Sequence, residues 1–273
     1  MKFSVSICVY EKDNPEHFSK ALDSLFLQTR KPDEIVLAVD GPIGEELENV
    51  IKKYDTYTCF KVVRQPENKG HGIARRLSIE NCTYPLIAIM DSDDVALLDR
   101  FEKQINIFKS SSEVDVCGGQ IEEFIENEDN IIGKRVVPET DREIKKYLKS
   151  RCPFNQQTVM FKKDIYTKAG GYVDWYMDED YYLWARMYLA GAKFCNLPDT
   201  LVKARINADS YKRRGGVKYF RSEKRLQKFL RKNGIISYFK YFTNVLKRFV
   251  VQVLMPSKVR SFVFIKFARE KVK

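Results

Sequence analysis

The sequence predicts an α/β fold organised around a doubly wound, mostly parallel sheet. Within roughly the first 90 of the 273 residues, four apolar strand-like runs alternate with stretches of helical periodicity. Each link between successive strands is long enough for a helical crossover, which is how parallel neighbours are connected. With 44% hydrophobic residues, the chain can bury a full core, and its size fits one large domain with appendages or two small domains.

The first half of the chain supplies this regular alternation. Residues 3–10 alternate with period two, whereas residues 15–29 place apolar side chains at helical spacing. The same two periodicities predict the later elements of this half. Strands are expected at 33–40, 60–63, 86–90 and 114–117, and helices at 45–54, 73–81 and 100–109.

The alternation becomes irregular after Gly118 and Gly119. Residues 120–137 indicate short strand segments around an acidic loop. A helix is then expected at 141–149, a strand at 157–161 and a helix at 180–189. The predicted organisation is a main domain over 1–210, divided into halves 1–118 and 119–210, and a tail over 211–273.

The net charge of +11 is unevenly distributed along the chain. Residues 203–273 contain 21 Lys and Arg against 3 Asp and Glu, so this segment carries +18 and residues 1–202 carry −7. An acidic body with a basic tail indicates that the tail contacts an anionic surface, either a membrane or a nucleic acid.

Apolar side chains in the tail gather on one helical face, with Lys240, Lys247 and Arg248 elsewhere on the helix. The face comprises Tyr238, Phe242, Val245, Leu246, Phe249, Val250, Val253 and Leu254, and after Pro256 come Phe262, Phe264, Ile265 and Phe267. No apolar run reaches the roughly 18 to 20 residues of a spanning helix. Basic amphipathic helices in a membrane interface are therefore predicted, and packing on the body or on a partner chain is the alternative.

The cysteines and the N-terminus bear on the compartment. The six cysteines form no C-x-x-C pair, and Cys8 and Cys117 fall in apolar runs, which favours reduced, buried thiols. Met1 leads straight into a strand without an apolar leader, so a secretory signal is not expected. We therefore expect a cytoplasmic protein, and the basic amphipathic tail adds the expectation that it is peripheral at the inner face of the cell membrane.

An acidic cluster closes the apolar run 85–90 and precedes a helix: Asp91, Ser92, Asp93 and Asp94. Ligands of open α/β sheets bind at the carboxyl ends of the strands. Clustered carboxylates at such an edge suit Mg²⁺ or Mn²⁺ carrying a phosphate. Capping of the following helix is the simpler interpretation of the same residues.

Other polar residues follow the neighbouring strands. Tyr10 and Glu11 leave the first strand and Asp40 leaves the second, where carboxylates can accept hydrogen bonds from a nucleobase or a ribose. Asp40 before Gly-Pro is also a common turn residue. Asn68, Gly70 and Arg75 indicate a flexible loop that brings a cation near a ribose or diphosphate.

These segments together resemble the family-two inverting glycosyltransferases of GT-A fold, bacterial enzymes of surface-polysaccharide synthesis. The resemblance covers roughly residues 1–210. Its motifs stand in family order: Val9-Tyr10-Glu11, Asp40-Gly41, Asn68-Lys69-Gly70 with Ala74-Arg75, Asp91-Ser92-Asp93-Asp94, and Glu179-Asp180 before Leu183-Trp184. It implies a GT-A fold whose residues 1–118 bind a nucleotide-sugar and whose residues 119–210 hold the acceptor and the catalytic base.

The resemblance also implies roles for individual residues. Asp93 would bind Mn²⁺ or Mg²⁺, with Asp91 assisting at the metal or binding the sugar donor. Asp180, beside Glu179, would be the base that deprotonates the acceptor hydroxyl. The remaining residues expected to bind the sugar donor are Val9, Tyr10, Glu11, Asp40, Asn68, Gly70, Arg75 and Ser92.

The residues around Asp180 admit two interpretations. Repulsion among Asp178, Glu179 and Asp180 can raise a carboxyl pKa toward that of a useful base. The same residues can simply form the acidic first turn of a helix. Trp175 and Trp184 could stack on acceptor sugars or belong to the core.

Two departures from the family pattern affect the predicted site. Gln156 and Asn207 stand where such enzymes often have histidines, so a histidine metal ligand is not evident. The motif after the second strand is reduced to Asp40-Gly41-Pro42, which leaves the nucleobase open.

We therefore predict a metal-dependent inverting hexosyltransferase. It would move a hexose from a nucleoside-diphosphate sugar, UDP-linked by preference, to a hydroxyl of a glycan or lipid-linked acceptor. A nucleotidyltransferase is the alternative enzyme, but no glycine-rich, lysine-bearing pyrophosphate loop opens the chain. A non-catalytic protein that binds nucleic acid through segments such as 211–214 is the other alternative, disfavoured by the apolar helical face of the tail.

Overall fold

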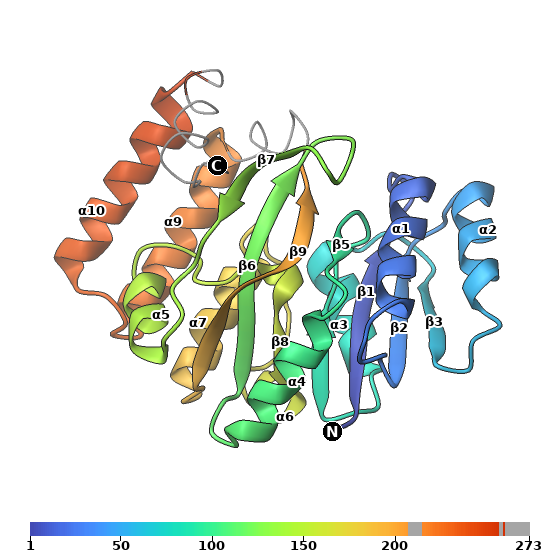
Figure 1. Cartoon of the computed structure of the whole chain (residues 1–273). Coiled ribbons are helices and arrows are strands. Elements are labelled where there is room, and N and C mark those ends of the chain that lie inside the picture. Colours follow the sequence, from blue (N-terminus) through green and yellow to red (C-terminus); the bar gives the residue numbers. More distant parts are fainter. Residues whose placement is uncertain (207–214, 257–258, 260–273) are drawn as a thin grey trace.

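The computed structural model describes residues 1–206, 215–256 and 259 (Figure 1). The Asn207 position, segment 211–214 and the apolar group at 262–267 lie outside these residues. The helices are α1 (Pro15–Phe26), α2 (Glu45–Tyr54), α3 (His71–Glu80), α4 (Arg100–Ser110), α5 (Asp141–Leu148), η1 (Gln156–Thr158), α6 (Lys163–Lys168), α7 (Glu179–Leu189), α9 (Val217–Lys232), α10 (Tyr238–Phe249) and η2 (Val250–Leu254). The strands are β1 (Phe3–Val9), β2 (Glu34–Asp40), β3 (Phe60–Gln65), β4 (Leu86–Ile89), β5 (Val95–Ala96), β6 (Val116–Phe124), β7 (Ile131–Arg135), β8 (Met160–Lys162) and β9 (Phe194–Arg205).

One sheet runs through the described residues in the order β3-β2-β1-β4-β8-β6-β9-β5, with β7 paired to β6. Strands β3, β2, β1 and β4 are parallel, so their carboxyl ends meet at one edge. Strand β8 pairs antiparallel with both β4 and β6 and joins this parallel half to the mixed half. The predicted α/β fold with a mostly parallel sheet is confirmed.

Helices cover both faces of the sheet. One core layer contains Phe18 of α1, Ile51 of α2 and Phe101 of α4, and these side chains pack against β1, β2 and β4. The opposite layer contains side chains of α3, α5, α6, α7 and α9, among them Trp184 and Leu226. Leu226 and Leu230 of α9 are fully buried. Helix α9 therefore belongs to the same core as the main domain, although the predicted boundary at 210/211 precedes it.

The structure differs from the predicted elements mainly in the second half. The strand predicted at 157–161 is a 3₁₀ turn over Gln156–Thr158 followed by the short strand β8. Strand β9 was not predicted, because its twelve residues include Pro198 and mix buried with half-exposed positions. Its identity as a strand comes from long-range pairing with β6 and β5, which a local pattern cannot display.

Helix α10 exposes several aromatic side chains to solvent and buries a polar one. It lies beside α9, at the far end of the molecule from α1 and α2 (Figure 1). Its inward face is polar, with Asn244 4% exposed, whereas Tyr238, Phe239 and Phe242 on the outward side are 71%, 77% and 57% exposed. Within the described residues, no helix has the length and apolarity needed to cross a bilayer.

Candidate active site

The motif residues meet at the carboxyl edge of the parallel strands. Asp40 ends β2, and Gly41 follows it at φ +84°, a conformation that favours glycine. A Cβ on Gly41 would lie 2.6 Å from the backbone nitrogen of Asn68. Only glycine therefore allows the loop after β3 to lie against the end of β2.

Asp40 holds this loop in place. Its carboxylate accepts hydrogen bonds from the backbone N–H of Lys69 at 2.8 Å and of Gly70 at 3.0 Å, and from Gln65 Nε2 at 2.9 Å. The residue is only 4% exposed. Asp40 thus shapes the loop that carries Asn68 and Gly70, and its direct contact with a sugar donor stays a prediction.

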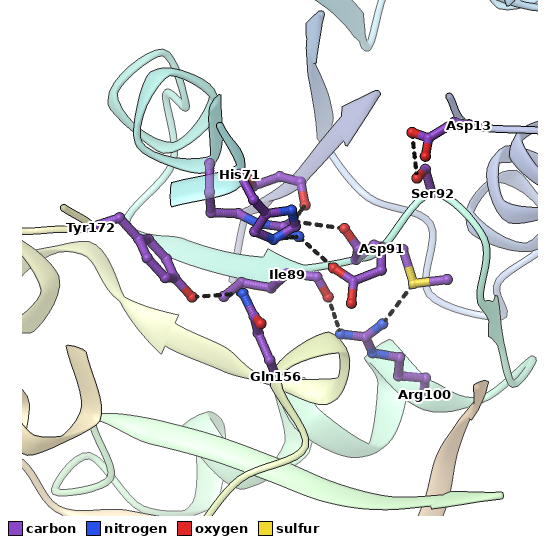
Figure 2. Close-up of polar contacts among 11 residues, drawn as sticks. Asp13, His71, Ile89, Asp91, Ser92, Arg100, Gln156 and Tyr172 are labelled. Carbon is purple, nitrogen blue, oxygen red and sulfur yellow. Dashed lines mark hydrogen bonds and ion pairs between the residues drawn. The ribbon is translucent and has the colours of Figure 1, made fainter. Parts of the chain in front are cut away.

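Two buried arginines lie beneath the acidic cluster. Arg75 of α3 donates to the carbonyl oxygens of Ser6 at 3.1 Å and Met90 at 2.7 Å, and it forms an ion pair with Asp91. Arg100 of α4 donates to the carbonyl of Ile89 at 2.7 Å, on the other side of β4 (Figure 2). Both side chains are 0% exposed. Arg75 therefore acts on the edge through Asp91 and the strand ends, and direct contact with a diphosphate stays a prediction.

His71 begins α3 at the same place. One of its ring nitrogens lies 3.2 Å from Arg75, and the ring stands beside Asp91 (Figure 2). Limited hydration of the ring and the positive charge of Arg75 lower the pKa of His71 below its usual range. The imidazole is therefore neutral at pH 7, although part of the residue faces solvent.

Asp93 and Asp94 play different parts in the acidic cluster. Asp94 is 2% exposed and accepts a hydrogen bond from the backbone N–H of Arg205 at 2.8 Å, so it ties β9 to the cluster. Asp93 is exposed. Crowding by protein atoms, followed by the negative charges of Asp91 and Asp13, raises the pKa of Asp93 to about 6.

Asp13, in the turn after β1, adds a further carboxylate that the sequence did not reveal as a site residue. It accepts a hydrogen bond from Ser92 Oγ at 2.9 Å (Figure 2). Burial raises the pKa of Asp13 to about 6. Among the described residues, no group of three or more His, Cys, Asp or Glu side chains is arranged to hold a metal by itself.

The second acidic run lies at the amino end of α7, close to the first. A Cβ on Gly72 of α3 would lie 2.6 Å from the carbonyl oxygen of Val173 and 3.6 Å from Glu179 Cβ, so the two helix starts are in contact. Burial and the charge of Asp180 raise the pKa of Glu179 to about 7. Proximity to Arg75 and Asp91 also affects this carboxyl, in opposite directions.

Asp180 contacts a cysteine. One carboxylate oxygen accepts the backbone N–H of Tyr181 at 2.6 Å, and the other lies 3.4 Å from the thiol of Cys152. Asp178 precedes the helix and is 3% exposed, and burial together with the charge of Glu223 raises its pKa well above the usual range. The acidic first turn and the raised carboxyl pKa values therefore occur together.

Neither tryptophan offers a free face for a sugar. Trp184 is 0% exposed and packs edge to face against Phe154. Its ring therefore has no face on which an acceptor sugar could stack. Trp175 is 8% exposed, with Tyr182 stacked at 4.2 Å and the guanidinium of Arg225 4.1 Å from its ring. Large apolar rings at helical spacing belong to the core here, as the alternative interpretation held.

Gln156 takes the position where a histidine was expected. Its Nε2 donates to the hydroxyl of Tyr172 at 3.2 Å, below the end of β4 (Figure 2). Sequence reasoning also missed Arg100 and Cys152, since nothing local distinguishes a buried arginine at a helix start from an exposed one.

Residues 4–170 match the model of the family described as Glycosyl transferase family 2. An uncharacterized glycosyltransferase of Haemophilus influenzae is 41% identical over 86% of this chain and 87% of its own length. The amylovoran biosynthesis glycosyltransferase AmsE of Erwinia amylovora is 37% identical over 96% and 97%. The UDP-Gal:alpha-D-GlcNAc-diphosphoundecaprenol beta-1,3-galactosyltransferase of Escherichia coli is 35% identical over 98% and 97%.

Solved structures share the fold. S. aureus TarS 1-349 in complex with UDP-GlcNAc superposes with a TM-score of 0.66 at 17% identity, over 98% of this chain and 76% of that one. Mannosyltransferase PcManGT from Pyrobaculum calidifontis, in complex with GDP-Man and Mn2+, gives a TM-score of 0.64 at 12% identity, over 96% and 74%. The chain has the GT-A fold, belongs to glycosyl transferase family 2 and is a glycosyltransferase.

Proposed function

We propose that this glycosyltransferase moves a hexose from a UDP-sugar to a hydroxyl of a glycan or lipid-linked acceptor, with inversion at the anomeric carbon and with a divalent metal. One observation carries the proposal. The acidic cluster Asp91–Asp94 and the acidic start of α7 lie close enough that the charges of Asp91 and Arg75 act on Glu179. One reaction centre between them could therefore use the first group for a leaving diphosphate and the second for a proton.

The sugar donor would lie along the carboxyl edge of β1, β2 and β4. Tyr10 presents a ring that is 37% exposed, and the loop with Asn68 and Gly70 is fixed by Asp40. Backbone groups of Val9 and Glu11 and the hydroxyl of Ser92 border the same edge. A UDP-sugar is chosen because the name of the Escherichia coli relative specifies UDP-Gal and TarS was solved with UDP-GlcNAc.

The residues present fit a metal that is shared with a substrate. Mg²⁺ and Mn²⁺ are commonly held by one or two carboxylates together with substrate phosphates and water. Asp93 is exposed at its outer side, and limited hydration followed by the negative charges of Asp91 and Asp13 raises its pKa; a cation would offset those charges. When bound, such an ion would neutralise charge that develops on the departing diphosphate.

Asp180 would accept the proton of the acceptor hydroxyl as that oxygen attacks the anomeric carbon. The new bond forms on the face opposite the bond to UDP, which breaks with its electron pair on the diphosphate. Glu179, whose pKa burial and the charge of Asp180 raise to about 7, would be protonated in part at neutral pH.

We further propose that α10 docks on an anionic membrane surface at the cytoplasmic face, where a lipid-linked acceptor would be found. The outward side chains Phe239, Phe242 and Leu246 are 77%, 57% and 50% exposed, and Lys247 lies next to them. Apolar surface of this kind is costly in water and stabilising in a bilayer interface, where lysines gain from anionic lipids.

A transfer assay tests the enzymatic proposal. We expect the full chain to release UDP from UDP-galactose when an alkyl-diphosphate-linked N-acetylglucosamine is present, and to need Mn²⁺ or Mg²⁺ for it. The product should carry the inverted anomeric linkage. Transfer at an equal rate in excess chelator would contradict the metal role, and release of pyrophosphate in place of UDP would indicate a nucleotidyltransferase.

Vesicle flotation tests the membrane proposal. The chain should float with vesicles that contain phosphatidylglycerol and remain behind with neutral vesicles. Replacing Phe239 and Phe242 together by serine should reduce the floated fraction several-fold while the secondary structure persists. Equal flotation of this variant, or binding to nucleic acid alone, would count against the membrane role of α10.

A further inference from the structure

Three polar side chains spaced four residues apart face inward along α10 and η2: Asn244, Arg248 and Gln252, next to Tyr241, which packs on the core. Each of them is largely removed from solvent, with Asn244 4% and Gln252 6% exposed as residues and the Arg248 side chain 13% exposed. A helix that only served to attach the chain to a membrane could rest on apolar neighbours. The polar face indicates that α10 holds specific groups of the body.

One set of these contacts leads to the candidate base through a loop. Asn244 Nδ2 donates to the carbonyl of Lys149 at 2.9 Å, and an Nη of Arg248 donates to the carbonyl of Ser150 at 2.8 Å. Two residues further along, the thiol of Cys152 lies 3.4 Å from the carboxylate of Asp180. Side chains of α10 therefore fix the backbone of the loop 149–152, whose Cys152 contacts Asp180.

A second set leads to the start of α7 through α9. Arg248 forms an ion pair with Glu223 of α9, whose side chain is 10% exposed. Glu223 in turn acts on the buried carboxyl of Asp178, and Ser222 beside it donates to the carbonyl of Tyr176 at 2.6 Å. Arg248 takes part in both sets of contacts, so one side chain links α10 to the loop 149–152 and to the start of α7.

A buried ion pair is seldom retained for stability alone. Removing two charges from water costs about as much as their attraction returns, and apolar substitutes of similar volume are often more stable. The position of this pair, next to the helix that carries Asp180, suggests a use for it.

We propose that Arg248 and Glu223 are positioning residues for Asp180, because they fix the loop 149–152 and the first turn of α7 in the arrangement that proton transfer requires. This inference rests on the proposed function, in which Asp180 is the base. It assigns to the tail a part in catalysis that does not depend on membrane docking.

Charges around the base predict opposite effects for the two residues. The positive charge of Arg248 lowers the pKa of Asp178 and the negative charge of Glu223 raises it. Groups that face Asp178, Glu179 and Asp180 from the surrounding elements are Cys152, Tyr172, Arg75, Asp91, Glu223 and Arg248. Removing one charge of this set should move the titration of the whole acidic run, since its members are coupled.

The experiment compares pH–rate profiles of the full chain, with UDP-galactose, Mn²⁺ and the water-soluble alkyl-diphosphate acceptor, so that membrane binding is not needed. Arg248→Met should lower kcat about 10-fold at pH 7 and move the acid limb upward by about half to one pH unit. Glu223→Gln should move the acid limb downward by a similar amount. Arg248→Lys should restore at least half of the lost kcat. Arg221→Met, at an exposed position of α9, is the matched control and should match the unchanged chain.

The outcomes distinguish a wrong assignment of Asp180 as the base from a wrong positioning role for Arg248 and Glu223. If Asp180→Asn keeps full activity, the proposed base is wrong. If Asp180→Asn is inactive while Arg248→Met and Glu223→Gln both keep the acid limb of the control, the positioning role is overturned. Should Arg248→Met fail to fold, Glu223→Gln decides alone, because it keeps the volume and a hydrogen-bond acceptor. General damage to the fold could lower kcat, but it would not move the acid limb in opposite directions.

Discussion

The acidic cluster at Asp91–Asp94 and the acidic run at Asp178–Asp180 have similar compositions but different surroundings. Beneath the first lie the buried guanidinium groups of Arg75 and Arg100, and Asp93 is exposed above them. Beside the second lie a thiol, a tyrosine, a further acid and the guanidinium of Arg248, and Asp178 is 3% exposed. Surroundings of the first kind suit a cation brought in with a phosphate, and those of the second suit a proton.

Substitution of one carboxylate in each group should separate these two uses most strongly. Asp93→Ala and Asp180→Asn should each lower transfer about 1,000-fold, because one would lose the metal and the other the base. Only Asp93→Ala should also lose the Mn²⁺-dependent thermal stabilisation by UDP, since Asp180 would not contact the nucleotide. Thermal melts with UDP and Mn²⁺ provide the measurement, and identical losses in both variants would remove the distinction between the groups.

Arg75, which lies beneath the acidic cluster Asp91–Asp94, should contribute measurably to the free energy of unfolding. Arg75→Met leaves the Asp91 carboxylate and the carbonyls of Ser6 and Met90 without their partner, so the free energy of unfolding should fall by about 3 to 5 kcal/mol. Its neighbour Arg76 makes an exposed pair with Glu80, and Arg76→Met should cost less than about 1 kcal/mol. Urea denaturation of both variants checks this, and equal losses would mean that Arg75 does not support the strand ends.

The acidic run Asp178–Asp180 should make the free energy of unfolding depend on pH. The pKa of Glu179 is higher in the folded chain than its ordinary value of 4.5, so the folded state loses stability as pH rises from 4.5 to 7 and carries the full cost above 7. Glu179→Gln removes that cost and should stabilise the chain by about 1 to 3 kcal/mol at pH 8. At pH 4.5 the gain should be close to zero. Urea midpoints at the two pH values provide the test, and an equal gain at both would show that the raised pKa is not the cause.

Local chemistry was enough to predict which residues meet at the sheet edge. Strand runs that end in polar residues predicted the edge at which Asp40, Asp91 and the 68–70 loop now meet. Within the acidic cluster, Asp94 is a buried contact to β9, whereas Asp93 is exposed. Residue types and their order are enough for such inferences.

Prediction from the sequence was less successful for residues whose contacts depend on packing. Arg75 was expected beside a phosphate, but a side chain at helical spacing can point to the strand ends below the site, as it does here. Cys152 and Arg248 lie far from Asp180 and Asp178 in sequence and approach them only through the fold. The apolar face of α10 was recognised, but the burial of its polar face needed coordinates.

Helix α10 has aromatic side chains in solvent and polar side chains buried against the body. This packing limits how the chain can be shortened. Cutting after Ile236 would remove the exposed aromatic side chains that promote self-association in water. The same cut would leave Glu223 buried without Arg248, and the carbonyls of Lys149 and Ser150 without their donors. A more soluble protein for crystallisation should therefore keep α10 whole and carry polar replacements at Phe239, Phe242 and Leu246. The buried contacts of α10 would then remain.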